Sequence, residues 1–334
     1  MSAPPLLELR NLSTHYVSAR GTRVVRAVDE VSLTLEAGST LGIVGESGSG
    51  KSTLALTIQR LLPPAARITG GQILFEGEDL RAKSDGEMRR IRGKRIAMIL
   101  QDPMASLNPL FTIGDQVAEP LRVHEGVGRA GAWSRAKELL KSVRISAPES
   151  RVGEYPHQMS GGMRQRIVGA IAISCAPRLL IADEPTTSLD LTIQAQYLNL
   201  LRDLQRQHHL ALIFITHNLG IVAKMCDQVA VMYAGRLVEW GPVARIFDAP
   251  AHPYTQALLG SIPRMGDGRE RLTAIDGQPP DLAAPPSGCA FHPRCPQAMA
   301  HCREQAPPET ALAPRHTTRC WLSVPATAQP TPAR

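Results

Sequence analysis

Apolar and polar positions follow two patterns over the first 245 residues of the chain. Residues 6–36 contain short alternating stretches, such as LLELRNL and VSLTLE, which are typical of half-exposed strands. Continuous apolar runs come next, several of them separated by helical patterns; the runs are residues 41–45, 95–100, 179–183, 211–216 and 228–233. Such runs alternating with helices indicate a parallel sheet covered on both faces. We therefore predict an α/β fold with an N-terminal antiparallel β part and a mostly parallel core sheet.

Two segments depart from this pattern. Residues 111–165 lack apolar runs and contain helical stretches such as SRAKELLKSVRI, so we expect a helical insert over about 102–165. After about residue 241 the chain becomes rich in proline, as in GQPPDLAAPP. We therefore predict a first domain over residues 1–245 and a small Cys/Pro-rich C-terminal extension over residues 246–334.

Composition narrows the class of protein. Hydrophobic residues make up 43% of the 334 residues, which is enough for a sizeable core, and aromatic residues only 4%. So few aromatic rings argue against a base-stacking surface for single-stranded nucleic acid. The net charge of +7 suits nucleotides, nucleic acid or an anionic membrane face, and equally an ordinary basic surface. No apolar run approaches the ~18 residues of a membrane span, and the N-terminus lacks a secretory signal. We expect a cytoplasmic protein.

The stretch GESGSGKST matches the phosphate-loop pattern GxxxxGK(S/T), between an apolar strand and a helix. Its residues are Gly45, Glu46, Ser47, Gly48, Ser49, Gly50, Lys51, Ser52 and Thr53. Glycines let backbone N–H groups wrap an oxyanion, and the helix start adds its positive dipole end. Lys51 would reach the outer phosphates, and the Ser52 hydroxyl suits Mg2+. A simple flexible turn is the alternative, but the strand and helix around the stretch favour a nucleoside triphosphate site.

Two more apolar strands end in residues that suit phosphoryl chemistry. In LLIADEP, Asp183 can hold Mg2+ through water, and Glu184 can orient or deprotonate the attacking water. In ALIFITH, His217 ends the strand and can reach a γ-phosphate. A solvated acidic turn and a structural histidine are the alternatives. The phosphate loop favours the catalytic interpretation of Glu184 and His217.

Residues 159–166, MSGGMRQR, resemble the signature motif of ATP-binding-cassette (ABC) ATPases. Ser160, Gly161 and Gly162 open a helix there and form a second anion-binding helix start. The resemblance runs over residues 6 to about 245. It implies the family's fold and its mechanism, in which two such domains bind ATP between one subunit's phosphate loop and the other's signature helix.

The same resemblance assigns three further residues. Gln101 in ILQDP matches the family's Q-loop, with a role in catalysis and at Mg2+. Asp190 in SLD matches the D-loop, which faces the partner subunit. Tyr16 falls where the family places an aromatic ring against adenine, although it also fits an ordinary strand residue. Small departures from the family pattern, such as Met159 at the start of the signature, remove no phosphate, metal or water ligand.

One branch of the family is especially similar. The stretches MILQDPMASLNPLFTIGDQ and VMYAGRLVEWGPVARIFDAPAHPYTQALLGSIP resemble the ATPases of oligopeptide and dipeptide importers. This implies an ATPase subunit that energises peptide import, peripheral on the cytoplasmic face of the inner membrane. Its implied partners are a second, related ATPase, two integral membrane permease subunits and an extracytoplasmic substrate-binding protein. Residues 101–125 are expected to contact the permeases. A nickel chelate or glutathione is an alternative cargo.

Four cysteines gather near the C-terminus: Cys289, Cys295, Cys302 and Cys320. Four thiolates can bind zinc or an iron–sulfur cluster, although the gaps are longer than those usual for structural zinc. Some members of the resembling transporter group carry a 4Fe-4S cluster in this segment. The resemblance therefore favours a 4Fe-4S cluster as a structural staple, with zinc or no metal as the alternatives.

Two other functions compete with transport. A soluble ABC ATPase acting on nucleic acid or ribosomes fits the basic charge, but the chain has neither a coiled-coil insertion nor a duplicated cassette. We therefore expect no nucleic-acid partner. A non-hydrolysing regulatory module is the other candidate, and the presence of Glu184 and His217 argues against it.

Overall fold

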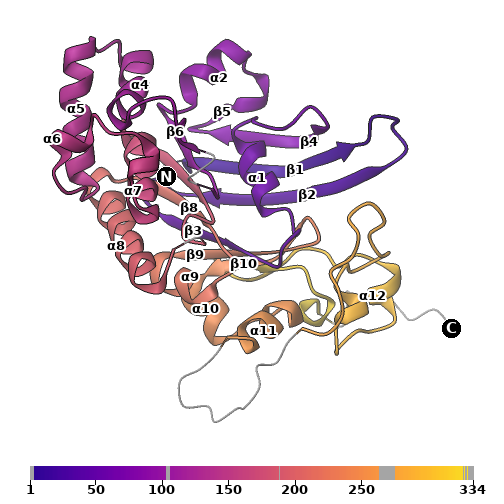
Figure 1. Cartoon of the computed structure of the whole chain (residues 1–334). Coiled ribbons are helices and arrows are strands. Elements are labelled where there is room, and N and C mark those ends of the chain that lie inside the picture. Colours follow the sequence, from indigo (N-terminus) through magenta and orange to yellow (C-terminus); the bar gives the residue numbers. More distant parts are fainter. Residues whose placement is uncertain are drawn as a thin grey trace. The chain divides into compact units, whose positions relative to one another are not determined.

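The first strands of the chain form an antiparallel sheet with a buried alternating face. In Figure 1 and in the pairing, β1 (Leu7–Val17) lies between β2 (Val24–Leu35) and β4 (Ala66–Phe75), and β5 (Glu78–Asp79) adds the edge. Leu7 and Leu9 are buried, as their alternation predicts, and Leu12 is buried beyond a shift in the strand register. Residues 6–36 were expected to form several short strands but form two long ones. The two strands stay paired along their length because bulges absorb the register shifts between them.

The structure, a computed structural model, describes residues 4–102, 106–187, 189–262 and 275–325, together with Thr327 and Gln329. It divides into two compact units. The first unit comprises Met1–Leu35, Thr40–Arg81 and Ile215–Arg334, and the second comprises Glu36–Ser39 and Ala82–Phe214. The antiparallel sheet belongs to the first unit.

The first unit also contains the strand that leads into the phosphate loop. That strand, β3 (Thr40–Val44), is fully buried and pairs in parallel with β9 (Gln228–Tyr233), which pairs antiparallel with β10 (Arg236–Pro242). The predicted helix after the loop is α1 (Lys51–Ile58). It ends before Pro63 because Arg60 adopts a left-handed backbone conformation, with φ of 52°.

The C-terminal residues add to the same unit. The hairpin β11 (Thr310–Ala313) and β12 (His316–Thr318) continues the sheet through β10. The same unit contains four short helices: α9 (Leu219–Met225), α10 (Val243–Asp248), α11 (Pro253–Gly260) and α12 (His301–Glu304). A buried apolar cluster joins Val44 of β3 to Tyr254 of α11 and to Phe291. Residues far apart in the sequence therefore share one core.

One buried histidine should make the stability of this core depend on pH. His252 caps α11 by accepting the Tyr254 N–H at its Nδ1 atom, and burial lowers its pKa from 6.5 to about 3. Below pH 6.5 His252 is protonated in the unfolded chain but stays neutral in the folded chain, so the free energy of unfolding decreases as pH falls. From pH 7 to 5.5 the loss should be about 1 kcal/mol. Denaturant titrations at both pH values measure it; in His252→Asn, which keeps a capping acceptor, the pH-dependent loss should shrink.

The second unit carries parallel strands and the predicted helical insert. Its strands β6 (Ile96–Ile99) and β7 (Leu179–Asp183) pair in parallel, and β8 (Ala211–Ile215) begins in it. Figure 1 shows α4 and α5 close to α7, and the three helices pack against one another. The helices among its described residues are α2 (Asp85–Ile91), α4 (Ile113–Glu125), α5 (Arg129–Ser142), α6 (Pro148–Arg151), α7 (Gly161–Ile173) and α8 (Leu191–His208). The predicted α/β fold is confirmed.

Among the described residues, no helix combines the length and the apolar character that crossing a membrane requires.

Candidate nucleotide site

The phosphate loop depends on glycine at its first and last turns. Gly45 and Gly50 have φ of 153° and 101°, which side chains disfavour. A Cβ at Gly45 would lie 2.1 Å from the Met232 carbonyl oxygen, and one at Gly50 would lie 2.0 Å from the Ala27 carbonyl oxygen. The loop backbone therefore lies in close contact with neighbouring strands at Gly45 and Gly50. Between them, a Cβ at Gly48 would meet nothing within 4 Å. This leaves an open cradle of backbone in front of α1.

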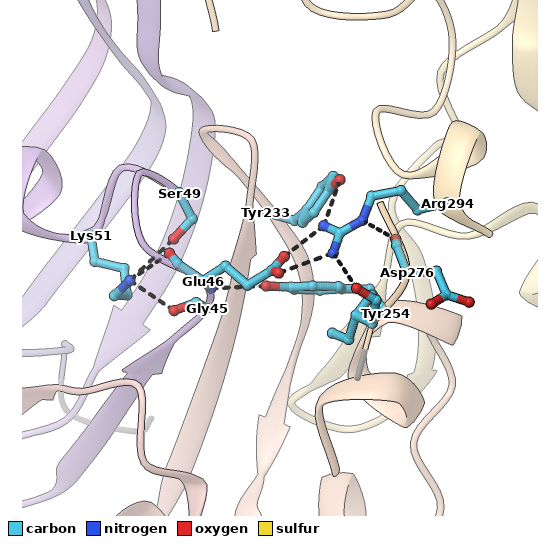
Figure 2. Close-up of polar contacts among 9 residues, drawn as sticks. Gly45, Glu46, Ser49, Lys51, Tyr233, Tyr254, Asp276 and Arg294 are labelled. Atoms are coloured by element: carbon cyan, nitrogen blue, oxygen red, sulfur yellow. Dashed lines mark hydrogen bonds and ion pairs between the residues drawn. The ribbon is translucent and has the colours of Figure 1, made fainter. Parts of the chain in front are cut away.

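Lys51 places its ammonium group inside this cradle. The side chain is only 6% exposed, and its Nζ atom donates to the carbonyl oxygens of Gly45 and Glu46, both at 2.8 Å (Figure 2). A third donor contact reaches the Ser49 hydroxyl at 3.4 Å. A buried cation beside a glycine-rich turn and a helix start fits the negative charge of a triphosphate. Ser52, the predicted magnesium ligand, is exposed on the first turn of the helix.

The glycine at the start of the loop gives a direct prediction. Gly45→Ala should weaken nucleotide binding by at least about tenfold, since its Cβ forces the loop away from Met232 and strains the backbone. Gly21→Ala is the matched control, because Gly21 also has positive φ (69°) but has open space around it. Calorimetric titration with magnesium and ATP measures both variants. Equal affinity in the two would contradict the proposed geometry of the loop.

Tyr16 lies beside the start of α1. Its hydroxyl is 3.3 Å from the Thr53 hydroxyl, and the side chain is half-buried on β1. The structure therefore brings this predicted adenine-stacking residue together with the phosphate loop within the first unit. Its role against a base stays a prediction. His217 lies exposed in the same unit, directly before Asn218, which caps α9.

In the second unit, Gln101 and Glu184 meet at the ends of two parallel strands. The Gln101 side-chain amide donates to Glu184 Oε2 at 3.3 Å, and the Thr187 hydroxyl donates to the same oxygen at 2.9 Å. Asp183, the last residue of β7, is 4% exposed. Glu184 itself has φ of 44°, an unfavourable conformation for a residue with a side chain. Strain of this kind is often kept where it positions a functional group.

The signature residues form a capped helix start. The Ser160 hydroxyl accepts the Met163 N–H at 3.3 Å, and α7 begins at Gly161. A Cβ at Gly161 would meet no atom within 4 Å. Ser160 and Gly161 are both exposed, so the helix N-terminus faces outward. Gly162 is packed, because a Cβ there would lie 2.8 Å from Ile193. Such an exposed helix start suits an anion.

Asp190 also caps a helix. Its carboxylate accepts the N–H groups of Thr192 and Ile193 at the start of α8, at 3.0 and 2.9 Å. The first residue of the SLD motif, Ser188, lies outside the described residues. The roles of Asp190 and of the signature residues in a dimer stay predictions.

The expected 4Fe-4S cluster is wrong. Within the described part of the chain, no three histidine, cysteine, aspartate or glutamate side chains are grouped so that they could hold a metal ion. Burial is the main cause that raises the pKa of the Cys289 and Cys320 thiols to about 11. Cys302 instead packs with Trp321 and Val324, with Cys289 against them. Of the four predicted ligands, Cys302 and Cys320 are buried, and Cys289 and Cys295 are half-buried. The absence of a metal-holding group among the described residues counts equally against the zinc alternative.

Two residues that contact the phosphate loop escaped the sequence analysis. Tyr254 and Arg294 both bond to Glu46 from the C-terminal part of the chain. Separations of 208 and 248 residues leave no local pattern that could indicate these contacts.

Family models match both parts of the chain. A model described as ABC transporter matches residues 28–187. A second, described as the oligopeptide/dipeptide transporter C-terminal region, matches residues 238–302. The first match contains the phosphate loop, the signature helix and the acids that end β7.

Relatives with similar sequences cover almost the whole chain. A probable peptide ABC transporter ATP-binding protein of Sinorhizobium fredii is 50% identical over 320 residues, which is 95% of each chain. The dipeptide transport ATP-binding protein of Bacillus subtilis is 50% identical over 318 residues, 95% of this chain and 94% of the relative.

A solved structure shares the fold. It is a dimeric ATP-binding cassette in a post-hydrolysis state bound to ADP and phosphate, with a TM-score of 0.64 and 26% identity. The match covers 71% of this chain and 98% of that one. With relatives identical at half of their positions, the assignment is clear: this chain belongs to the ABC transporter family, among the ATP-binding proteins that carry the oligopeptide/dipeptide transporter C-terminal region.

Proposed function

We propose that this protein is the ATP-hydrolysing subunit that energises the import of di- or oligopeptides through an ABC transporter. The observation that carries the proposal is the Lys51 ammonium held inside a glycine-rich phosphate loop, in a chain with the oligopeptide/dipeptide C-terminal region. Relatives named for peptide and dipeptide transport support the cargo class. None of these comparisons supports an ATPase that acts on nucleic acid.

Nucleotide binding falls to the first unit. Backbone N–H groups of residues 45–53 and the N-terminus of α1 bind the phosphates, and Lys51 turns from the loop carbonyls toward the outer phosphates. Tyr16 packs against the base. Mg2+, which would neutralise negative charge on the phosphates, would be held by Ser52 of the first unit, and the sequence and its family resemblance predict the same role for Gln101 and Asp183. Their oxygen donors, a hydroxyl, an amide and a carboxylate, are the types that this ion prefers.

Hydrolysis falls to Glu184. Its carboxylate orients the attacking water and accepts the proton, while Gln101 and Thr187 hold one carboxylate oxygen in place. His217 donates to the γ-phosphate oxygen. Ser160 and the first N–H groups of α7 stabilise the same phosphate on a partner ATPase, which makes closure of the pair depend on ATP. Asp190 lies at the contact between the two ATPases.

The proposed assembly contains a second ATPase, related rather than identical, and two integral membrane permease subunits. An extracytoplasmic binding protein delivers the peptide. This chain sits peripherally on the cytoplasmic face of the inner membrane, with residues around 101–125 against the permeases. The exposed side chains of Leu110 (80%) and Phe111 (54%) suit such an apolar contact.

The ATPase activity of the purified complex tests this proposal. With the binding protein present, a mixture of di- and oligopeptides should raise the rate of phosphate release, while free amino acids should not. If only a nickel chelate or glutathione stimulates phosphate release, that solute and not a peptide is the cargo. ATPase activity that no solute changes, or that DNA or RNA stimulates, would reject a role in import.

A further inference from the structure

Glu46, the second residue of the phosphate loop, is held at each of its polar groups (Figure 2). Its backbone N–H donates to the Tyr254 hydroxyl at 2.9 Å, and its carbonyl oxygen accepts the Lys51 ammonium at 2.8 Å. Its two carboxylate oxygens accept Arg294 Nη1 at 2.7 Å and Nη2 at 3.0 Å. One loop residue therefore connects the cation that serves the phosphates to two residues of the C-terminal region.

Arg294 is built into its position rather than lying on the surface. Its side chain is 4% exposed, and its remaining donors bond to the carbonyl oxygens of Asp276 at 2.8 Å and Ile275 at 3.2 Å. Nη1 also donates to the Tyr233 hydroxyl at 3.3 Å, and the guanidinium lies 5.8 Å from the centre of that ring. A guanidinium fixed on all sides presents a rigid fork, and a fork-to-carboxylate pair fixes the orientation of both groups.

Tyr254 is equally immobile. It is fully buried, and its ring packs with those of Tyr233 and Phe291 at centroid distances of 4.5 and 5.3 Å. The same buried cluster includes Val44, the last residue of the strand that enters the loop. The hydroxyl that accepts the Glu46 N–H is therefore fixed by the core of the first unit.

We propose that Arg294 and Tyr254 are positioning residues of the nucleotide site, which hold Glu46 and with it the phosphate loop in the shape that receives ATP. The inference rests on the proposed function and deepens it. A loop with three glycines samples many backbone conformations, and only the molecules with a formed cradle bind nucleotide. The C-terminal region then sets part of the affinity for ATP.

Two variants of the full chain test this by calorimetric titration with magnesium and ATP. Tyr254→Phe removes the hydroxyl and keeps the packed ring, and we expect about threefold weaker binding; Arg294→Met should weaken it about tenfold, in proportion to the lost population of formed loops. The double variant Arg294→Met/Glu46→Gln should bind ATP no more weakly than Arg294→Met alone, because both changes remove the same interaction between Arg294 and Glu46.

Arg23→Met is the matched control. Arg23 also reaches the C-terminal region, through an ion pair of 2.9 Å with Asp281, but their side chains are 63% and 57% exposed. Exposed pairs contribute little, and this one touches no loop residue. Affinity for ATP should equal that of the wild type. In the assembled transporter, Arg294→Met should raise the KM for ATP while most of kcat remains.

The outcomes separate the two proposals. A wild-type protein that binds no ATP refutes the proposed function itself. The positioning role is overturned if the wild type binds ATP and the folded variants Tyr254→Phe and Arg294→Met bind it within twofold of the wild-type affinity. Thermal melts without nucleotide identify a purely structural role, in which Tm falls and the Kd does not change. If Arg294→Met does not fold, Glu46→Gln decides, because it leaves the C-terminal region intact and should weaken binding by a similar factor.

Discussion

Replacing Lys51 with alanine should abolish ATP-driven transport and weaken ATP binding by at least about 100-fold. The ammonium is the cation of the cradle, only 6% exposed and bonded to two loop carbonyls. Without it, the phosphates lose a charge-assisted partner, and the carbonyl oxygens of Gly45 and Glu46 lose the donor that they share. Calorimetric titration measures the affinity, and uptake by vesicles that contain the complex measures transport.

Lys141→Ala is the control for this experiment, because Lys141 is exposed on α5. It should leave affinity and uptake at wild-type values. Transport that continues unchanged in Lys51→Ala would show that the nucleotide does not bind at this loop.

The second large effect concerns Glu184. Glu184→Gln should still bind ATP but turn over roughly 1,000-fold more slowly, which is the usual size of a lost general base. Glutamine has nearly the same shape and still offers an oxygen to Gln101 and Thr187, so the site geometry should persist. The two ATPases should then remain closed around ATP. Phosphate release by the assembled complex measures turnover, and size-exclusion chromatography with ATP detects the trapped pair.

Glu138→Gln on the exposed side of α5 controls for the loss of one negative charge. It should hydrolyse ATP at the wild-type rate. If Glu184→Gln does the same, another group activates the water.

The parts of the fold that local sequence decides were predicted well. The apolar run before Gly45 is β3, and the runs that end at Asp183 and near Thr216 are β7 and β8. Each is short, continuous and buried, which is the pattern of a strand covered on both faces. The phosphate loop was equally predictable from the sequence, because its glycines, its lysine and the start of the helix all lie within nine residues of one another.

Features that depend on distant residues were not predictable in this way. Nothing near Arg294 indicates that its guanidinium fits the carboxylate of Glu46, 248 residues away. The cysteines failed for a related reason: spacing lists candidate ligands but does not say how folding groups their side chains. Around Cys302, contact with Trp321 and Val324 makes a small apolar cluster. The arrangement of side chains in the fold, which spacing alone does not reveal, is what counts against a metal site in the described residues.

Uptake of a labelled peptide into proteoliposomes tests the central claim most directly. The vesicles contain this chain, the proposed partner ATPase and the permeases, with the binding protein on the opposite side from ATP and magnesium. The account predicts that peptide accumulates only with hydrolysable ATP, and not with Glu184→Gln or with an analogue that resists hydrolysis. Accumulation that proceeds equally without ATP would contradict it.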